Sequence, residues 1–283
     1  RSFIYFHNGF SLTSLCDYYD IKMENAHRAS ADAMATGQLF LFLVQEVISR
    51  PLSLIQRIEN LISGSDTYNA ILFTNILKTA VQLNIIDGLM DSPSNYSPPN
   101  NIYNHTVSRG EAELPKHPES WVEDEGAFSK HWNGFEKRPS QTQLIKDSFD
   151  AFSNDHILVA EAGTGLGKSL AYLASGYIAA KQKDNALVVS THTKTLQNQL
   201  FVTDIPKLAN AIDQPLNAVI YKGKYNYICR TRLNQLLSNH AHVLNSTEIE
   251  YLIPLIVWEW ESNSGDINEC NGFQMNRHRR IWS

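Results

Sequence analysis

The sequence predicts an α/β fold that contains a parallel β-sheet. Short apolar segments alternate with helix-forming segments in the second half of the chain, and a glycine-rich loop follows the first of these apolar segments. Strands that alternate with helices are typical of βαβ units, whose strands run parallel. A proline-rich stretch between residues 91 and 120 separates this half from a first half with a helical pattern.

The first half of the chain contains two predicted helices. Residues 29–48 have apolar side chains at helical spacing and no proline, and Pro51 follows soon after. Residues 67–86 predict a second helix after a break at residues 64–66. Five of the ten prolines then fall between residues 91 and 120. Because proline interrupts helices, we interpret that stretch as a linker or a long loop.

The second half of the chain contains three predicted helices and three predicted strands. The apolar runs are short enough for strands, and the intervening segments carry helix-forming residues. In chain order the elements are a helix at 140–152, a strand at 156–160, a helix at 169–182, a strand at 186–190, a helix at 193–208 and a strand at 216–221.

The composition is that of a folded chain. Apolar residues make up 43% of the sequence and charged residues 19%, which excludes a mainly disordered protein. Three cysteines are too few for a disulfide scaffold. The longest purely apolar run, residues 39–44, is far shorter than the ~20 residues of a membrane span. No secretory signal is visible, so we expect a cytoplasmic protein without a membrane partner.

The net charge of -5 is distributed unevenly. Residues 1–130 hold 9 basic and 15 acidic residues, whereas residues 131–283 hold 15 and 14. Local clusters of basic residues can bind phosphates whatever the net charge is. Solvated surface charge explains the same residues equally well. The two clusters in the second half are Lys222, Lys224, Arg230 and Arg232, then Arg277, Arg279 and Arg280.

A phosphate-binding loop over residues 161–169 is the strongest chemical signal. It follows a predicted strand and opens a predicted helix, where backbone N–H groups and the helix N-terminus attract anions. Lys168 would place its charge on the β- and γ-phosphates, and Ser169 would offer its hydroxyl to Mg²⁺. A glycine-rich turn with a surface lysine is the alternative. The predicted nucleotide-binding residues are Ala162 (where glycine is usual), Gly163, Thr164, Gly165, Leu166, Gly167, Lys168 and Ser169.

Four segments in this order resemble superfamily-two helicases of the DinG and XPD type, over about residues 131–283. They are residues 138–141, the phosphate loop, residues 190–200 and residues 221–229. The resemblance implies a RecA-like motor domain that binds ATP, with Arg138 and Gln141 near the adenine. It also implies that residues 190–200 contact the nucleic-acid backbone, through Thr191, His192, Thr193 and Gln199. Taken alone, hydroxyl residues after a strand are more often a helix cap.

Cys229 ends the last of these segments. The resemblance implies that Cys229 is the first of four ligands of a [4Fe–4S] cluster, with Cys270 a weaker candidate for another. Taken alone, a single cysteine is usually a small buried hydrophobic residue. Three cysteines cannot supply four ligands, so the chain by itself cannot close such a site.

Residues 10–36 resemble the last third of a DnaQ-like 3′–5′ exonuclease domain, which has an RNase H-like fold. The resemblance implies that His27 is the general base and that Asp32 is a ligand of a divalent metal pair. Residues five apart on one helix differ by about 140°, so His27 must lie in the loop before the helix. The alternative is an acidic residue at a helix start with a polar histidine nearby.

These resemblances predict the organisation of the chain. Residues 1–50 are the C-terminal part of the exonuclease domain, and residues 51–130 are a helical connector with the proline-rich linker. Residues 131–283 are the first part of the helicase ATP-binding domain, including the start of an iron–sulfur region. The first residue is Arg1, and the earlier acidic motifs of the exonuclease and the acidic tetrad of the helicase are missing. We therefore expect a fragment cut at both ends.

The complete protein is expected to be an ATP-dependent helicase fused to a 3′–5′ exonuclease. The resemblance favours 5′–3′ movement on single-stranded or forked DNA, in repair or replication. Two other functions fit the same loop. One is an ATP-gated clamp or nuclease regulator that does not unwind DNA, and the other is an unrelated P-loop enzyme such as a small-molecule kinase.

Overall fold

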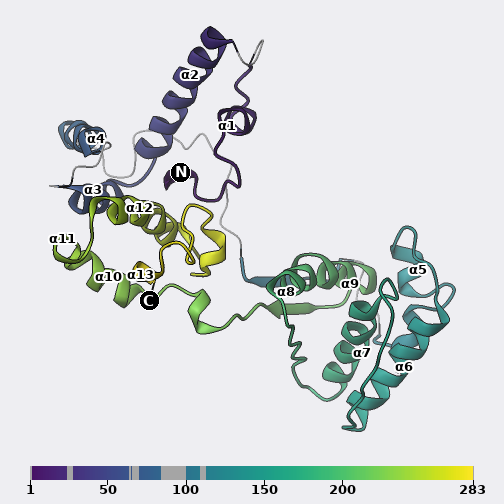
Figure 1. Ribbon diagram of the computed structural model, residues 1–283. Helices are drawn as coiled ribbons and strands as arrows, with labels where there is room; N and C mark the ends of the chain where they lie inside the picture. The colour runs from purple at the N-terminus through teal and green to yellow at the C-terminus, as the bar shows by residue number, and fades with distance from the viewer. Residues whose placement is uncertain are drawn as a thin grey trace. The chain divides into compact units, whose positions relative to one another are not determined.

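The computed structural model describes residues 2–23, 28–63, 65, 70–83, 100–108 and 113–282. They form two compact units, which are described separately (Figure 1). The first unit combines residues 1–100 with residues 222–283, and the second consists of residues 101–221. The predicted boundaries after residues 50 and 130 stay predictions.

The first unit is helical. Its helix α12 packs against α3 and η1, so the core of this unit contains residues from both ends of the chain. The elements are η1 (Ser2–Ile4), α1 (Leu12–Tyr18), α2 (Ala29–Ile48), α3 (Leu52–Ile62), α4 (Ala70–Gln82), η4 (Lys224–Asn226), α10 (Arg230–Ser238), α11 (His240–Val243), α12 (Ser246–Glu261), η5 (Ile267–Glu269) and α13 (Arg279–Trp282).

Helix α12 carries the centre of the first core. The helix begins at a capping box, in which the Asn245 side chain accepts from the Glu248 N–H and the Glu248 carboxylate accepts from the Asn245 N–H. Trp258 is fully buried and belongs to the same apolar cluster as Leu54 and Ile58 of α3. Burial of these side chains joins α12 to α3, because removing apolar surface from water is the main stabilising term in folding.

Helix α2 confirms the prediction for residues 29–48, and α4 confirms the second helix over residues 70–82. Leu39 faces a small core with α1, whereas Phe40 and Leu41 are exposed. Among the described residues, α2 is the one helix that could cross a membrane by length and composition. Core helices of soluble proteins meet the same criteria, so this finding does not establish a membrane span.

The second unit packs helices beside a two-stranded antiparallel sheet. Helices α6 and α7 lie side by side (Figure 1), and β1 pairs with β2 so that Ile102 faces Val219 and His105 faces Leu216. The elements are β1 (Ile102–His105), η2 (Pro118–Trp121), α5 (Ala127–His131), α6 (Pro139–Ser153), α7 (Lys168–Gln182), α8 (Lys194–Gln199), the π-helix η3 (Leu200–Asp204), α9 (Ile205–Ile212) and β2 (Leu216–Val219).

Four of the six elements predicted for this half are confirmed. Helices α6 and α7 match the predictions for residues 140–152 and 169–182. The helix predicted at 193–208 is present, but a π-helical segment divides it into α8 and α9. Strand β2 covers most of residues 216–221.

The strands predicted at residues 156–160 and 186–190 are wrong. Both segments lie outside any strand, and Ile157 and Val188 are 94% and 86% exposed. A strand exists only when a neighbour pairs with its backbone N–H and C=O groups, and within the described part of the chain no strand pairs with either segment. Strand β2 pairs instead with β1, antiparallel, from the region interpreted as a linker.

The predicted parallel sheet is therefore not found among the described residues. They form helices with one small antiparallel sheet, an arrangement compatible with an α/β fold.

Candidate nucleotide site

The phosphate loop has the backbone that its glycines allow. Gly165 and Gly167 have φ values of +81° and +82°, in the left-handed region that favours glycine. Gly167 is the N-cap of α7, so the helix begins directly at Lys168. The first N–H groups of a helix have no partner within it, and they can therefore bind an anion.

The Lys168 side chain forms hydrogen bonds within the phosphate loop. Its Nζ donates hydrogen bonds to the carbonyl oxygens of Ala162, at 2.7 Å, and Gly163, at 2.8 Å. The side chain is exposed, so its ammonium group is accessible from solvent. Phosphate oxygens would replace these two neutral acceptors by charged ones, which make stronger hydrogen bonds.

Arg138 and Gln141, at the start of α6, hold the other side of the loop. The Arg138 guanidinium donates to the carbonyl oxygen of Gly165, and the Gln141 amide donates to that of Gly167 at 3.2 Å. Gln141 is only 4% exposed. The structure therefore brings both residues to the phosphate loop, and their contact with adenine stays a prediction.

Ser169 lies near a residue that the sequence reasoning missed, Tyr172, one helical turn later in α7. Burial raises the pKa of the Tyr172 hydroxyl, the Ser169 hydroxyl lowers it, and the nearby charge of Asp204 raises it further. Asp204 ends the π-helix, and one of its carboxylate oxygens is buried without a hydrogen-bond partner among the described residues. The i, i+3 spacing is the signal that could have placed Tyr172 beside Ser169.

The predicted nucleic-acid contacts surround the start of α8. Thr193 is the N-cap, and its hydroxyl accepts from the Leu196 N–H at 3.2 Å. The Thr191 hydroxyl donates to the Thr193 carbonyl oxygen at 3.2 Å. His192 and Gln199 are exposed. The helix-cap interpretation is confirmed for Thr193, and nucleic-acid contact by these four residues stays a prediction.

The residues predicted for the exonuclease site are only partly described. His27 lies outside the described residues. Asp32 lies in the first turn of α2 and is half-buried. In the parts of the chain that the structure describes, no three His, Cys, Asp or Glu side chains come together in a way that could hold a metal ion. A single carboxylate does not fit a metal pair, which needs several such ligands.

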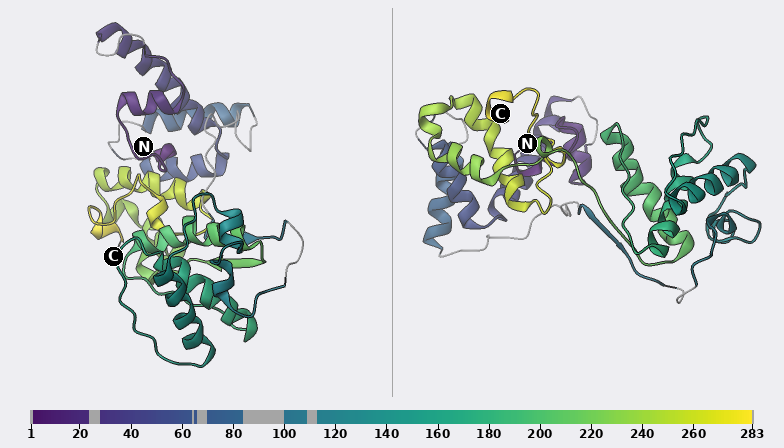
Figure 2. Two further views of the ribbon diagram at one scale, coloured as in Figure 1. Left: turned by 90° about the vertical axis from the view of Figure 1, so that its right-hand side faces the viewer. Right: turned by 90° about the horizontal axis from the view of Figure 1, so that it is seen from below.

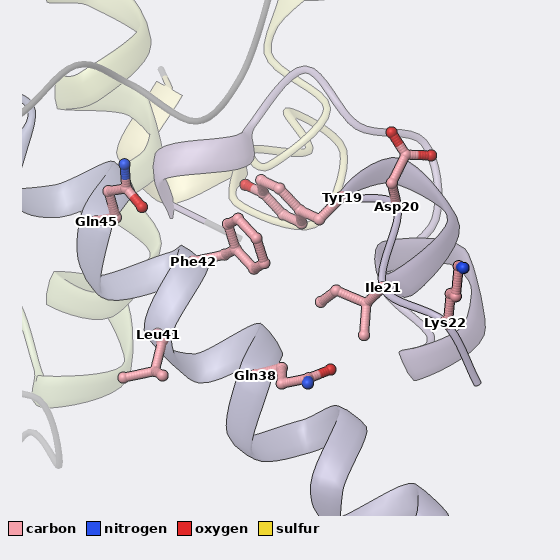
Figure 3. A pocket seen from close by; sticks show the side chains of 8 residues that line it. All are labelled: Tyr19, Asp20, Ile21, Lys22, Gln38, Leu41, Phe42 and Gln45. Atoms are coloured by element: carbon pink, nitrogen blue, oxygen red, sulfur yellow. The ribbon is translucent and has the colours of Figure 1, made fainter. Parts of the chain in front are cut away.

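A hollow of about 530 Å³ lies between the end of α1 and helix α2 (Figure 3). The rings of Tyr19 and Phe42 stack in it with their centroids 5.2 Å apart, and the Tyr19 hydroxyl donates to the buried Glu46. Asp20 and Lys22 also line the hollow, whereas Asp32 does not. The hollow is therefore separate from the predicted metal ligand.

The cysteines do not assemble a cluster site. Cys229 is exposed at the N-cap of α10, whereas Cys270 is buried with its Sγ 3.6 Å from the Pro254 carbonyl oxygen. Burial raises the pKa of the Cys270 thiol to about 12. A cluster ligand must be a thiolate, so Cys270 in this position does not fit that role. Cys16 is buried in the core between α1 and α2.

Replacing Gly167 with alanine is expected to distort the loop. A Cβ at this position would clash with Nε2 of Gln141, and the positive φ would strain it as well. Strain of about 1–2 kcal/mol and a lost hydrogen bond of about 1 kcal/mol should lower the stability of the second unit. Urea unfolding followed by circular dichroism measures this change.

The matched control is Gly163→Ala. A Cβ at Gly163 would meet no atom within 4 Å. Equal stability of the two variants would contradict the assigned contact between Gln141 and Gly167.

Comparison with known proteins identifies similar bacterial sequences. The chain is 28% identical over 273 residues to a protein of Bacillus subtilis (strain 168) named 3′-5′ exonuclease DinG, an alignment that covers 93% of this chain and 28% of that protein. The namesake from Staphylococcus epidermidis is 28% identical over 274 residues, and that of Staphylococcus aureus (strain USA300) is 27% identical over 271 residues. Each of these three alignments includes 93% of the residues of this chain.

No family model matches the chain, and no solved structure matches it. The chain spans 28% of the length of the curated relatives to which it is similar. Its similarity to proteins named 3′-5′ exonuclease DinG extends through both units.

Proposed function

We propose that the chain is part of an ATP-dependent DNA helicase, moving 5′–3′, that is fused to a 3′–5′ exonuclease acting in DNA repair or replication. The observation that carries the ATP-dependent part is the phosphate loop, which ends in a left-handed Gly167 and opens directly into α7. The names of the similar proteins support action on DNA and the exonuclease part.

The loop residues divide the work of binding ATP. The free N–H groups at the start of α7 and the Lys168 ammonium bind phosphate oxygens. Arg138 and Gln141 hold the loop carbonyls of Gly165 and Gly167, so that the loop keeps its shape when Lys168 moves to the phosphates. Because the carbonyl oxygens of Gly165 and Gly167 already accept hydrogen bonds, less conformational entropy is lost when the loop binds ATP.

Ser169 suits Mg²⁺ because its hydroxyl is a hard oxygen ligand that is half-exposed beside the phosphate position. When bound, Mg²⁺ neutralises charge on the β- and γ-phosphates.

The exonuclease part is proposed on the relatives' names and the residues at 10–36. Such an enzyme implies a divalent metal, for which Asp32 would be one ligand, with His27 as the base that takes a proton from water. Since Asp32 is a single carboxylate, we assign no catalytic step to the described residues.

Strand displacement and strand degradation test the two parts separately. The full-length protein is mixed with a forked duplex labelled on one strand, with and without ATP and Mg²⁺. Displacement that requires ATP, together with shortening from the 3′ end that does not, is the expected result. Shortening without displacement at saturating ATP would contradict the helicase proposal and favour an ATP-gated nuclease regulator.

A further inference from the structure

Two basic segments that lie far apart in the sequence meet on the first unit. The first is the segment around η4, and the second is the C-terminal segment that ends in α13. The Trp282 indole N–H donates to the Tyr225 carbonyl oxygen at 3.1 Å, which joins the two segments. In both views of Figure 2 the yellow C-terminal segment lies beside the yellow-green helices of the same unit. The sequence alone did not show that these clusters are neighbours.

Some basic side chains of these two segments form ion pairs within the unit, and others do not. Three cations of these clusters neutralise carboxylates of the same unit, in the pairs Lys222–Asp266, Arg230–Glu259 and Arg280–Glu248. Within the described part of the chain, no ion pair involves Lys224, Arg277 or Arg279, and all three side chains are exposed. These three cations are therefore available to an external anion.

An exposed aromatic ring lies beside one of these cations, Lys224. Tyr225 is 76% exposed, although burying a tyrosine ring is favourable. The Lys224 Nζ lies 5.2 Å from the centre of that ring. Arg279 and Trp282 are three residues apart on α13, a spacing that places two side chains on one face of a helix. A flat, exposed ring beside exposed cations is a combination that binds single-stranded nucleic acid.

We propose that Lys224, Tyr225, Arg279 and Trp282 form a binding surface for single-stranded nucleic acid, which we term the Tyr225 surface. A base stacks on the Tyr225 ring, while Lys224 and Arg279 neutralise the neighbouring phosphates. Single strands are favoured over duplexes because a base must be unstacked before it can lie on a side-chain ring. The inference rests on the proposed action on DNA for the class of ligand, and it concerns residues outside the nucleotide site.

Fluorescence anisotropy of labelled oligothymidylate titrated with the 283-residue chain tests the surface. Tyr225→Ala should weaken binding about tenfold, because a stacked base is lost. Tyr225→Phe should bind as the wild type does, since it keeps the ring. The double variant Lys224→Gln, Arg279→Gln should reduce the slope of log K against log salt by roughly 1.4, which corresponds to two phosphate contacts on a single strand.

Lys181→Gln is the matched control. Lys181 also lies near a tyrosine ring, 5.8 Å from the centre of Tyr177, but that tyrosine is buried. Its substitution should leave oligothymidylate binding unchanged. Tyr225→Ala keeps the carbonyl that accepts from Trp282, and an unchanged melting temperature verifies that the variant folds.

Two failures have different meanings. Wild-type affinity in Tyr225→Ala would overturn the Tyr225 surface and leave the proposed action on DNA intact. Absence of binding by the wild-type chain at low salt would contradict the surface together with DNA as a partner of this chain. Tighter binding of duplex than of single strand would overturn the single-strand assignment.

Discussion

Replacing Lys168 with alanine should weaken binding of Mg·ATP about 100-fold, because truncating one partner of a charged hydrogen-bonded pair costs about 2–5 kcal/mol. ATP-dependent strand displacement by the full-length protein should then be lost. Exonuclease activity should persist, since Lys168 lies in the second unit and Asp32 in the first. Calorimetric titration with Mg·ATP and the forked-duplex assay measure the two effects.

Lys183→Ala is the control for Lys168→Ala. Lys183 caps the other end of α7, and it also donates to a backbone carbonyl, that of Phe152, at 2.9 Å. Its loss removes a comparable hydrogen bond to a carbonyl oxygen, here at the end of α6, without touching the phosphate loop. Equal weakening of nucleotide binding by both substitutions would show that Lys168 acts only through the fold. Equal loss of nuclease and ATP-dependent activities in Lys168→Ala would contradict the assignment of two separate sites.

Trp258→Ala is expected to lower the free energy of unfolding of the first unit by about 3–5 kcal/mol, the usual cost of truncating a buried tryptophan. Trp258 is fully buried in the core that joins α12 to α3. The substitution would leave a cavity that the neighbouring side chains cannot close. Urea unfolding followed by far-ultraviolet circular dichroism measures the shift of the midpoint.

Trp260 provides a control on the same helix. It is the same residue type two positions later, and it is 45% exposed. Its replacement by alanine should change stability by only about 0.5 kcal/mol, as for most surface substitutions. Similar destabilisation by both substitutions would contradict the assigned core.

Five helical segments were predictable because their signals are local, whereas α12, the centre of the first core, was not predicted. Apolar spacing and the nearby Pro51 located α2, and alternation of segments located α6 and α7. Capping likewise depends on neighbouring residues, so the role of Thr193 at α8 could be weighed in advance. The interruption at residues 200–204 could not be predicted, since no spacing in the sequence indicates where i→i+4 hydrogen bonds give way to i→i+5 bonds.

The strands show the opposite case. Apolar runs at 156–160 and 186–190 resemble buried strands, but a ladder of hydrogen bonds requires a second strand at the right place. Strand β2 pairs with residues 102–105, which lie within the proline-rich stretch and gave no strand signal. Pairing depends on chain segments that are remote in sequence, and periodicity within one segment contains no information about them.

The sequence by itself determined the helical segments at 29–48, 70–82, 140–152, 169–182 and 193–208 and the residues of the phosphate loop, because a loop motif and helical spacing are encoded within a few consecutive positions. Only the tertiary structure decided which groups hold that loop: Arg138 and Gln141 reach it from α6, across more than 20 residues of sequence. Only the tertiary structure also showed which basic residues form ion pairs within the protein. It buried Lys222 against Asp266 and joined Tyr225 to Trp282, since partners in space are set by packing and not by order along the chain.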